Sequence, residues 1–286
     1  MTKRRNFFNL MLILGVLWMV FINTPLLATD GLSRLSILDL YDNTAVARPG
    51  LQTDWGFSCL ITGTEKTILF DTGKNGAVLM NNMAKLGVNP RQIDLVVLSH
   101  RHQDHIGGLT AFLEKNSHVT LYVPKPFLTN PAFVKVIKEY SPQVITINGP
   151  QSICKNVFTT GVMREKLTGS QDKEAGILLE QSLIIQTSKG LVVITGCAHP
   201  GIINILHKTT EVLNAEPLLV LGGLHLLEQN PASISEVIDQ FKQLGIDYVG
   251  SSHCTGKLAM KQLQAAYQDH YLDFEVGKTI NLEDLK

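Results

Sequence analysis

The chain has 286 residues, and its 25 basic and 25 acidic side chains cancel to a formal net charge of zero. A balanced charge provides no long-range field that would collect nucleic acid, so a nucleic-acid enzyme is disfavoured. The hydrophobic fraction of 44% is that of an ordinary globular protein, and the length fits one catalytic domain, which we expect over residues 30–286.

The N-terminus has the pattern of an export signal. Three basic residues at positions 3–5 precede an apolar run over 7–22, and the small residue Ala28 follows. This run of 16 residues is shorter than the roughly 20 needed to span a bilayer, which favours a cleaved signal over a retained anchor. We predict that residues 1–29 are a signal peptide or membrane anchor. The domain would then be exported, periplasmic or extracellular, with or without membrane attachment through this segment.

The first half of the domain predicts short strands that end in polar turns. Strands are expected over 35–40, 59–62, 67–70 and 95–98, and a short helix over 80–86 with Gly87 as its stop. Asp71-Thr72-Gly73 follows the third of these strands, and Ser99-His100 follows the fourth. Polar residues at strand ends are typical of sites in layered α/β folds, where loops from several strands converge.

The second half continues the same alternation. Further strands are expected over 119–123, 144–147, 182–187, 191–195, 218–221 and 248–249, and helices over 131–140 and from a cap at Ser233 or Ser235 to Leu244. Ser188-Lys189-Gly190 between two of the strands predicts a hairpin. The sequence therefore predicts an α/β fold.

Residues 100–105 concentrate side chains that bind metals. The run His100-Arg101-His102-Gln103-Asp104-His105 holds three imidazoles and a carboxylate. These groups are ligands for zinc and other first-row divalent ions. Spacing of two puts His100 and His102 on one side of an extended segment, whereas Asp104 and His105 can face elsewhere as the chain turns at Gly107-Gly108. One loop can therefore supply ligands to two ions.

This run, together with its preceding strand and the earlier Asp-Thr-Gly turn, resembles the metallo-β-lactamase superfamily. The resemblance implies an αββα sandwich and one or two divalent ions, zinc first of all, with iron or manganese as alternatives. It implies a first site of His100, His102 and His199, and a second site of Asp104, His105 and His253. His199 and His253 each follow an apolar strand, as the superfamily's later motifs do.

Three further residues stand close to the predicted ligands. The resemblance implies that Asp71 orients a ligating imidazole by a hydrogen bond, while turn chemistry alone is the other explanation for an Asp there. Cys197 and Cys254 lie within two residues of His199 and His253. Their thiols either support the ligands or are small buried groups.

One position departs from the superfamily pattern. A bridging Asp commonly follows the strand that here ends at Leu221-Gly222-Gly223, and the nearest polar side chain is His225. We expect His225 either to ligate or face substrate, or to be structural. The site would then have weaker bridging, through a metal-bound hydroxide, or hold one ion.

Four later segments resemble a narrower branch, the group named for dihydropterin-methyl-ribofuranosylaminobenzene-phosphate synthase. They are Glu180-Gln181-Ser182-Leu183, Thr195-Gly196-Cys197-Ala198-His199-Pro200-Gly201, Gly222-Gly223-Leu224-His225-Leu226 and Ser252-His253-Cys254-Thr255-Gly256. The likeness extends from about Leu35 to the C-terminus. An exported protein has little use for a pterin-building step, so the name of the branch is a weak guide to substrate.

The resemblance implies a metal-dependent hydrolase in which a metal-activated hydroxide attacks an ester-like, lactone, thioester or phosphoester centre of a small molecule. Asp104, which would hold the nucleophile, and His225 are the candidate catalytic residues. The alternatives are a metal-dependent transferase related to pterin biosynthesis, a mononuclear iron oxidoreductase, and a binding protein without catalysis. Trp55 is expected either to wall the pocket or to join the core. His118, His207 and His270 are expected to be structural or surface residues.

Overall fold

The computed structural model describes residues 32, 34–44, 49–164 and 178–286. The predicted leader, residues 1–29, lies outside these ranges, so the signal or anchor stays a prediction. Within the described ranges, no helix combines the length and the apolar character that crossing a membrane would require.

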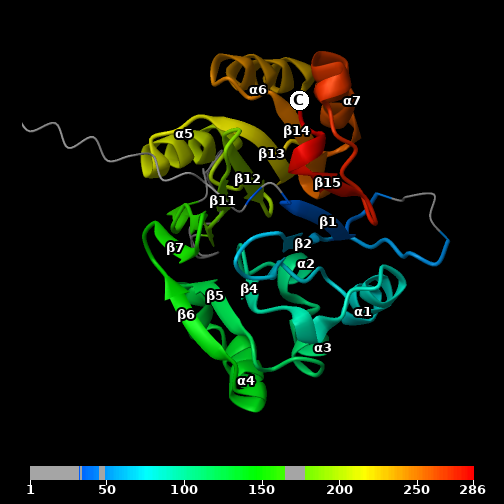
Figure 1. The fold of residues 1–286 in the computed structure, drawn as a ribbon, viewed down its shortest axis with the longest axis vertical. Helices are drawn as coiled ribbons and strands as arrows, with labels where there is room; N and C mark the ends of the chain where they lie inside the picture. The colour runs from blue at the N-terminus through cyan, green and yellow to red at the C-terminus, as the bar shows by residue number, and fades with distance from the viewer. Residues whose placement is uncertain (1–31, 33, 45–48, 165–177) are drawn as a thin grey trace, which may run out of the picture.

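Two sheets and a short strand pair form the centre of the described chain (Figure 1). The first sheet has the order β15-β1-β2-β3-β4-β5-β6, and its strands from β3 to β6 run parallel. The second has the order β14-β13-β12-β11-β8-β7, with β12, β13 and β14 parallel. The strands are β1 (Ser36–Tyr41), β2 (Ser58–Thr62), β3 (Ile68–Phe70), β4 (Leu95–Val97), β5 (Thr120–Pro124), β6 (Gln143–Ile147), β7 (Gln151–Cys154), β8 (Val157–Thr159), β9 (Met163–Arg164), β10 (Leu179–Glu180), β11 (Leu183–Gln186), β12 (Leu191–Thr195), β13 (Pro217–Gly223), β14 (Tyr248–Ser252) and β15 (Thr279–Asn281).

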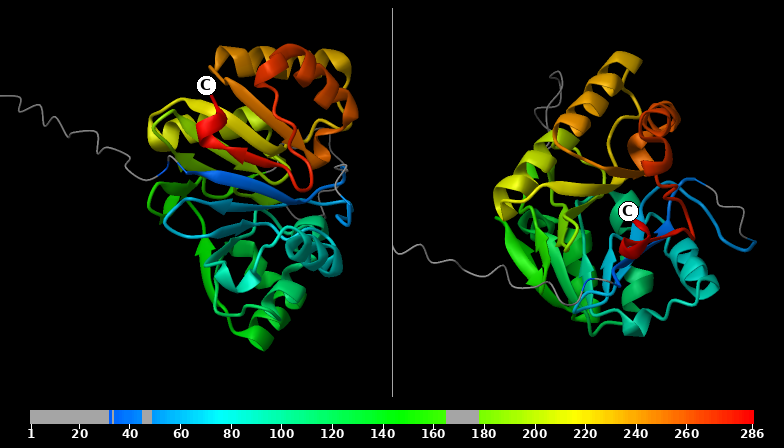
Figure 2. Two further views of the ribbon diagram at one scale, coloured as in Figure 1. Left: turned by 45° about the vertical axis from the view of Figure 1, so that its right-hand side comes forward. Right: turned by 45° about the horizontal axis from the view of Figure 1, so that its top comes forward.

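Helices cover the outer face of each sheet (Figure 2). The α-helices are α1 (Gly76–Lys85), α2 (Gln103–Ile106), α3 (Leu109–Leu113), α4 (Pro131–Tyr140), α5 (Ile202–Leu213), α6 (Pro231–Gln243) and α7 (Lys257–Tyr267). Short 3-10 turns are η1 (Pro90–Gln92), η2 (Lys125–Thr129), η3 (His253–Thr255), η4 (Gln268–His270) and η5 (Leu282–Asp284). The helices α1, α3 and α4 lie on the first sheet, and α5, α6 and α7 lie on the second.

Neighbouring residues of the central strands supply three separate apolar layers. Val97 and Ile194 belong to the cluster between the sheets, which joins side chains of both. Val96, one residue away from Val97, instead packs with the helices of the first sheet, and Val193 packs with those of the second. Strand side chains alternate between faces, so a strand buried on both sides is apolar throughout. The layers confirm the predicted αββα sandwich.

Most predicted elements are present, with shifted ends. The hairpin of β11 and β12 is confirmed, and α4 has the predicted bounds. The cap predicted at Ser233 or Ser235 is wrong, because α6 begins earlier, where the Asn230 side chain accepts a hydrogen bond from the Ser233 amide. The helix expected over 80–86 begins at Gly76. The helices α5 and α7 and the strand β15 had no counterpart in the prediction.

Candidate metal centre

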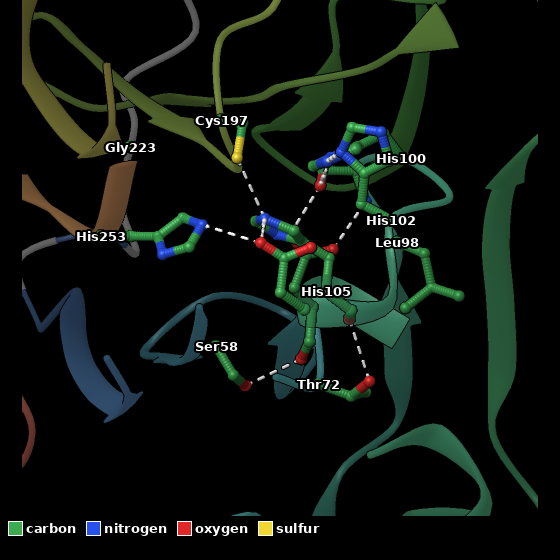
Figure 3. Close-up of polar contacts among 12 residues, drawn as sticks. Ser58, Thr72, Leu98, His100, His102, His105, Cys197, Gly223 and His253 are labelled. Atoms are coloured by element: carbon green, nitrogen blue, oxygen red, sulfur yellow. Dashed lines mark hydrogen bonds and ion pairs between the residues drawn. The ribbon is translucent and has the colours of Figure 1, made fainter. Parts of the chain in front are cut away.

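The predicted ligands follow strands that lie side by side. In the first sheet β3 and β4 are parallel neighbours, so Asp71 lies next to the chain that leads from β4 into His100. In the second sheet His199 follows β12 and His253 follows β14, with β13 between them. The six predicted ligands form two clusters. Figure 3 shows four of them, His100, His102, His105 and His253, together with Cys197.

Sharp backbone turns close these strands. Asp71, Ala198, His225 and His253 all have a left-handed backbone, with φ of 56°, 63°, 55° and 47°. For a residue other than glycine, this backbone conformation costs on the order of 1–3 kcal/mol, and it persists only where the surrounding structure fixes it. Four of them around one edge mark this as the part of the fold where local strain is concentrated.

The first cluster consists of the three histidines His100, His102 and His199. One ring nitrogen of each lies within 4.8 Å of the others. His100 Nε2 is 3.1 Å from His102 Nδ1, and the ring centroids of His102 and His199 are 4.9 Å apart. His100 and His199 are buried, and His102 is the most exposed of the three, with its ring packed against both. This is the set that the resemblance implied for a first ion.

A carboxylate that the sequence analysis gave no role holds His199. Glu180, at the end of β10, is almost fully buried, and its Oε2 lies 2.8 Å from His199 Nδ1. The same oxygen accepts the His199 amide, and Oε1 accepts the amides of Cys197 and Ala198. Burial opposes ionisation of Glu180, but His100 and the hydrogen bond from His199 hold its pKa well below the usual range. Glu180 therefore fixes the proton of His199 on Nδ1 and presents Nε2 to the cluster.

The second cluster contains Asp104, His105 and His253 and one donor that was not predicted, Cys197. Cys197 Sγ lies 3.1 Å from His105 Nε2, and Asp104 Oδ2 lies 3.3 Å from His253 Nε2. In Figure 3 the side chains of Cys197 and His253 both point toward His105, from separate strand ends. Asp104 and His105 reach this cluster because α2 begins directly after His102, so the chain turns earlier than predicted.

Buried partners orient the histidines of the second cluster. Asp71 Oδ2 lies 2.7 Å from His105 Nδ1, and this carboxylate also accepts the amide and hydroxyl of Ser99. Asn43 Oδ1 lies 3.0 Å from His253 Nδ1, and Asp42 accepts the His253 amide. Asp71 is thus placed as predicted, next to a ligand's far nitrogen. The contacts of Asp42 and Asn43 were missed.

The electrostatics favour the protonation state that a ligand needs at His100, His102 and Asp104, whereas at His105 burial is outweighed by the Asp71 carboxylate, which raises the pKa. Burial lowers the pKa of His102 to about 4 and that of His100 well below 6.5, so both rings are neutral at pH 7. Burial would raise the pKa of Asp104, but His253 and His105 hold it well below its usual range. Metal ligation requires neutral imidazole and ionised carboxylate.

The donor set fits a divalent metal ion. His253 Nε2 is buried and makes no hydrogen bond, because its contact with Asp104 Oδ2 at 3.3 Å is an ion pair that lacks hydrogen-bond geometry, whereas a buried polar atom is nearly always hydrogen-bonded. Imidazole nitrogen, carboxylate oxygen and thiol sulfur are the usual donors in zinc and iron sites. Here the histidine rings are oriented by hydrogen bonds to Glu180, Asp71 and Asn43. A cation between Asp104 and His253 would give that nitrogen its missing partner.

Comparison with known proteins agrees with this geometry. A family model described as the metallo-beta-lactamase superfamily matches residues 56–168. An uncharacterized protein of Methanocaldococcus jannaschii is 30% identical over 267 residues, which cover 85% of this chain and 98% of that protein. The chain belongs to the metallo-β-lactamase superfamily.

Two further relatives support the narrower branch of the metallo-β-lactamase superfamily. The 7,8-dihydropterin-6-methyl-4-(beta-D-ribofuranosyl)-aminobenzene-5'-phosphate synthase of Methanocaldococcus jannaschii is 27% identical over 283 residues, covering 86% of this chain and 96% of that protein. The crystal structure of Tm1679, described as a metal-dependent hydrolase of the beta-lactamase superfamily, has a TM-score of 0.72 and 28% identity. It covers 87% of this chain and all of Tm1679.

The candidate metal centre is bordered by an open cavity of about 630 Å³. His199, His225, Trp55 and Cys254 line it beside residues of α5 and α6. The His225 ring lies 4.4 Å from the His199 ring, and Trp55, 39% exposed, lies 4.8 Å from the His253 ring. Trp55 therefore walls the cavity and is no core residue.

The other three histidines lie apart from both clusters. His118 and His207 are exposed, and His270 stacks on Tyr248 with ring centroids 4.5 Å apart. Their predicted separation from the metal centre agrees with these positions.

Proposed function

We propose that this chain is a metal-dependent hydrolase that cleaves an ester-like, lactone, thioester or phosphoester bond in a small molecule. The observation that carries the proposal is the pair of donor clusters beside an open cavity, which His199 of the first cluster lines and whose lining residue Trp55 contacts the His253 ring of the second. A bound divalent ion supplies Lewis acidity and acidifies water toward neutral pH. Zinc is the first choice for the ion, and iron or manganese are the alternatives.

Two side chains have proposed roles in the reaction. Asp104 is held ionised between His105 and His253, so its Oδ2 can accept a hydrogen bond from the attacking water and orient it. His225 stands in the cavity wall beside His199 and can donate a hydrogen bond to the leaving group. Trp55, which also lines the cavity, would help to exclude water.

A transferase is the second candidate, since one relative is named as a synthase. The same residues would then orient an organic nucleophile in place of water. We also propose that the domain is exported, which rests on the sequence of residues 1–29 alone.

The test uses the purified chain stripped by a chelator and reloaded with zinc, iron or manganese. A panel of ester, lactone, thioester and phosphodiester substrates is assayed with and without an added organic nucleophile. The proposal predicts hydrolysis that chelation abolishes, that reloading restores, and that Asp104→Asn reduces at least about a hundredfold, the scale for misplacing a reacting group. Products that always contain the added nucleophile would favour the transferase, and turnover that survives chelation would contradict both.

A further inference from the structure

The second cluster contains a sulfur atom, Cys197 Sγ, that is not among the six ligand positions implied by the superfamily motifs. Cys197 Sγ joins Asp104, His105 and His253, with all donor atoms within 4.8 Å of one another. The thiol is buried, at 3% exposure, and lies 3.1 Å from His105 Nε2. The sulfur atom is therefore close enough to the donor atoms of three predicted ligands to bind the same ion.

The bridging carboxylate of the superfamily has no room at its usual place. The strand β13 ends at Gly223, where a Cβ would lie 2.3 Å from the Gly196 carbonyl oxygen and 2.7 Å from Cys254 Sγ. Separations below 3.0 Å force the backbone to shift. A carboxylate side chain at this position would therefore require the two strand ends to move apart, so a substitution of Gly223 alone would not restore it.

Cys197 enters from the neighbouring strand and is fixed there. It follows β12, which runs parallel to β13 with Thr195 opposite Gly222. Its amide donates to Glu180 Oε1 at 2.9 Å, so the backbone that carries the thiol is pinned by the same carboxylate that orients His199. His253 Nε2, which makes no hydrogen bond, belongs to the same four donors.

We propose that Cys197 binds the second metal ion through its sulfur atom, in place of the bridging carboxylate. The inference rests on the proposed function insofar as the centre must hold metal. The two sites would then differ: three nitrogen donors at the first, and two nitrogens, an oxygen and a sulfur at the second. A soft thiolate favours zinc or iron over manganese or magnesium, so the second site would reject the harder ions.

Cobalt provides a probe that reports sulfur ligation without any substrate. The chelated full chain is titrated with Co²⁺, and its near-ultraviolet absorption and bound cobalt are measured together. Thiolate ligation produces a charge-transfer band that nitrogen and oxygen ligands do not. The variants are Cys197→Ser and Cys254→Ser, because Cys254 is an equally buried thiol that contacts the Cys197 carbonyl.

The band should appear in the wild type and in Cys254→Ser, and it should vanish in Cys197→Ser. The cobalt affinity of the second site should fall at least ~10–100-fold in Cys197→Ser, the range for losing even an outer partner of a ligand, while the first site still fills. Circular dichroism checks that each variant folds. Bound cobalt without the band in the wild type, or a band that persists in Cys197→Ser, would overturn the proposal and leave the proposed function standing. A wild type that binds no cobalt, zinc or iron would overturn both.

Discussion

Replacing Glu180 tests whether the metal centre depends on a carboxylate that touches no metal. Its two oxygens accept four hydrogen bonds, from the amides of Cys197, Ala198 and His199 and from the His199 ring. Glu180→Ala would leave these four donors buried without an acceptor. Glu180→Gln would keep one acceptor oxygen and turn an amide group toward the other two donors.

The size of the effect follows from these contacts. One hydrogen bond to a charged group contributes about 1.5–3 kcal/mol. The contributions of several bonds to one group are not additive, so breaking a whole buried charged network costs about 3–5 kcal/mol, which is less than their sum. We expect Glu180→Ala to lower the free energy of unfolding of the metal-free protein by about 4 kcal/mol, and Glu180→Gln by about half of that. Because His199 loses its orientation, the metal affinity of the first cluster should fall ~10–100-fold in both variants.

Urea unfolding of chelated protein gives the stability, and competition with a coloured chelator gives the metal affinity. Glu211→Gln is the matched control, since its side chain is 69% exposed and pairs only at the surface with Lys208. It should stay within about 0.5 kcal/mol of the wild type with unchanged metal affinity. If Glu180→Gln behaves like this control in both measurements, Glu180 has no positioning role.

Three further outcomes are expected. A Cβ at Gly223 would lie 2.3 Å from a carbonyl oxygen, so Gly223→Ala should lower the urea midpoint by the equivalent of about 1–3 kcal/mol, while Gly149→Ala, with nothing within 4 Å, should leave it unchanged. Burial lowers the pKa of His102 to about 4, so unfolded metal-free chain binds more protons than the folded chain between pH 6.5 and 4, and stability falls as the pH falls through this window. His102→Gln should make that decline shallower, and equal slopes would contradict the assignment. Trp55→Ala removes a cavity wall 4.8 Å from the His253 ring, so KM should rise about tenfold at unchanged metal content, and loss of metal would contradict a wall role.

The residues that come together in the two clusters could be predicted because their signal is local. Four of the six lie within residues 100–105, and His199 and His253 each follow an apolar strand. Parallel strands place such ends at one edge, which is why residues about 150 positions apart in sequence meet. The α/β class followed from the same strand pattern, and the αββα layering from the family resemblance.

The partners that orient the ligands were missed because their contacts are tertiary. Glu180 ends a two-residue strand 19 positions before His199, and Asn43 is 210 positions from His253. No pattern in the neighbouring sequence predicts that a carboxylate will accept hydrogen bonds from three backbone amides. The quoted segment Glu180-Gln181-Ser182-Leu183 contained the residue but not its role. Cys197 was noted beside His199 and remained undecided for the same reason, since only the turn after β12 brings its thiol to His105.

The helix α5 shows how packing overrides local preference. Its sequence Ile202–Leu213 contains β-branched residues that weaken a helix, including the pair Thr209-Thr210. Burial of Ile205 and Leu206 against the second sheet compensates for this weakness. The cap of α6 was misplaced because Asn230 precedes Pro231, which fits the first helical turn and so begins the helix before either predicted serine.

Metal stoichiometry tests the two-cluster centre most directly. Elemental analysis of the purified wild type, His102→Ala, His253→Ala and the exposed control His207→Ala would be compared after identical loading with zinc. We expect His102→Ala to lose metal from the first cluster, His253→Ala to lose it from the second, and His207→Ala to match the wild type. Wild-type stoichiometry in both His102→Ala and His253→Ala would contradict the assignment of these clusters as the metal centre.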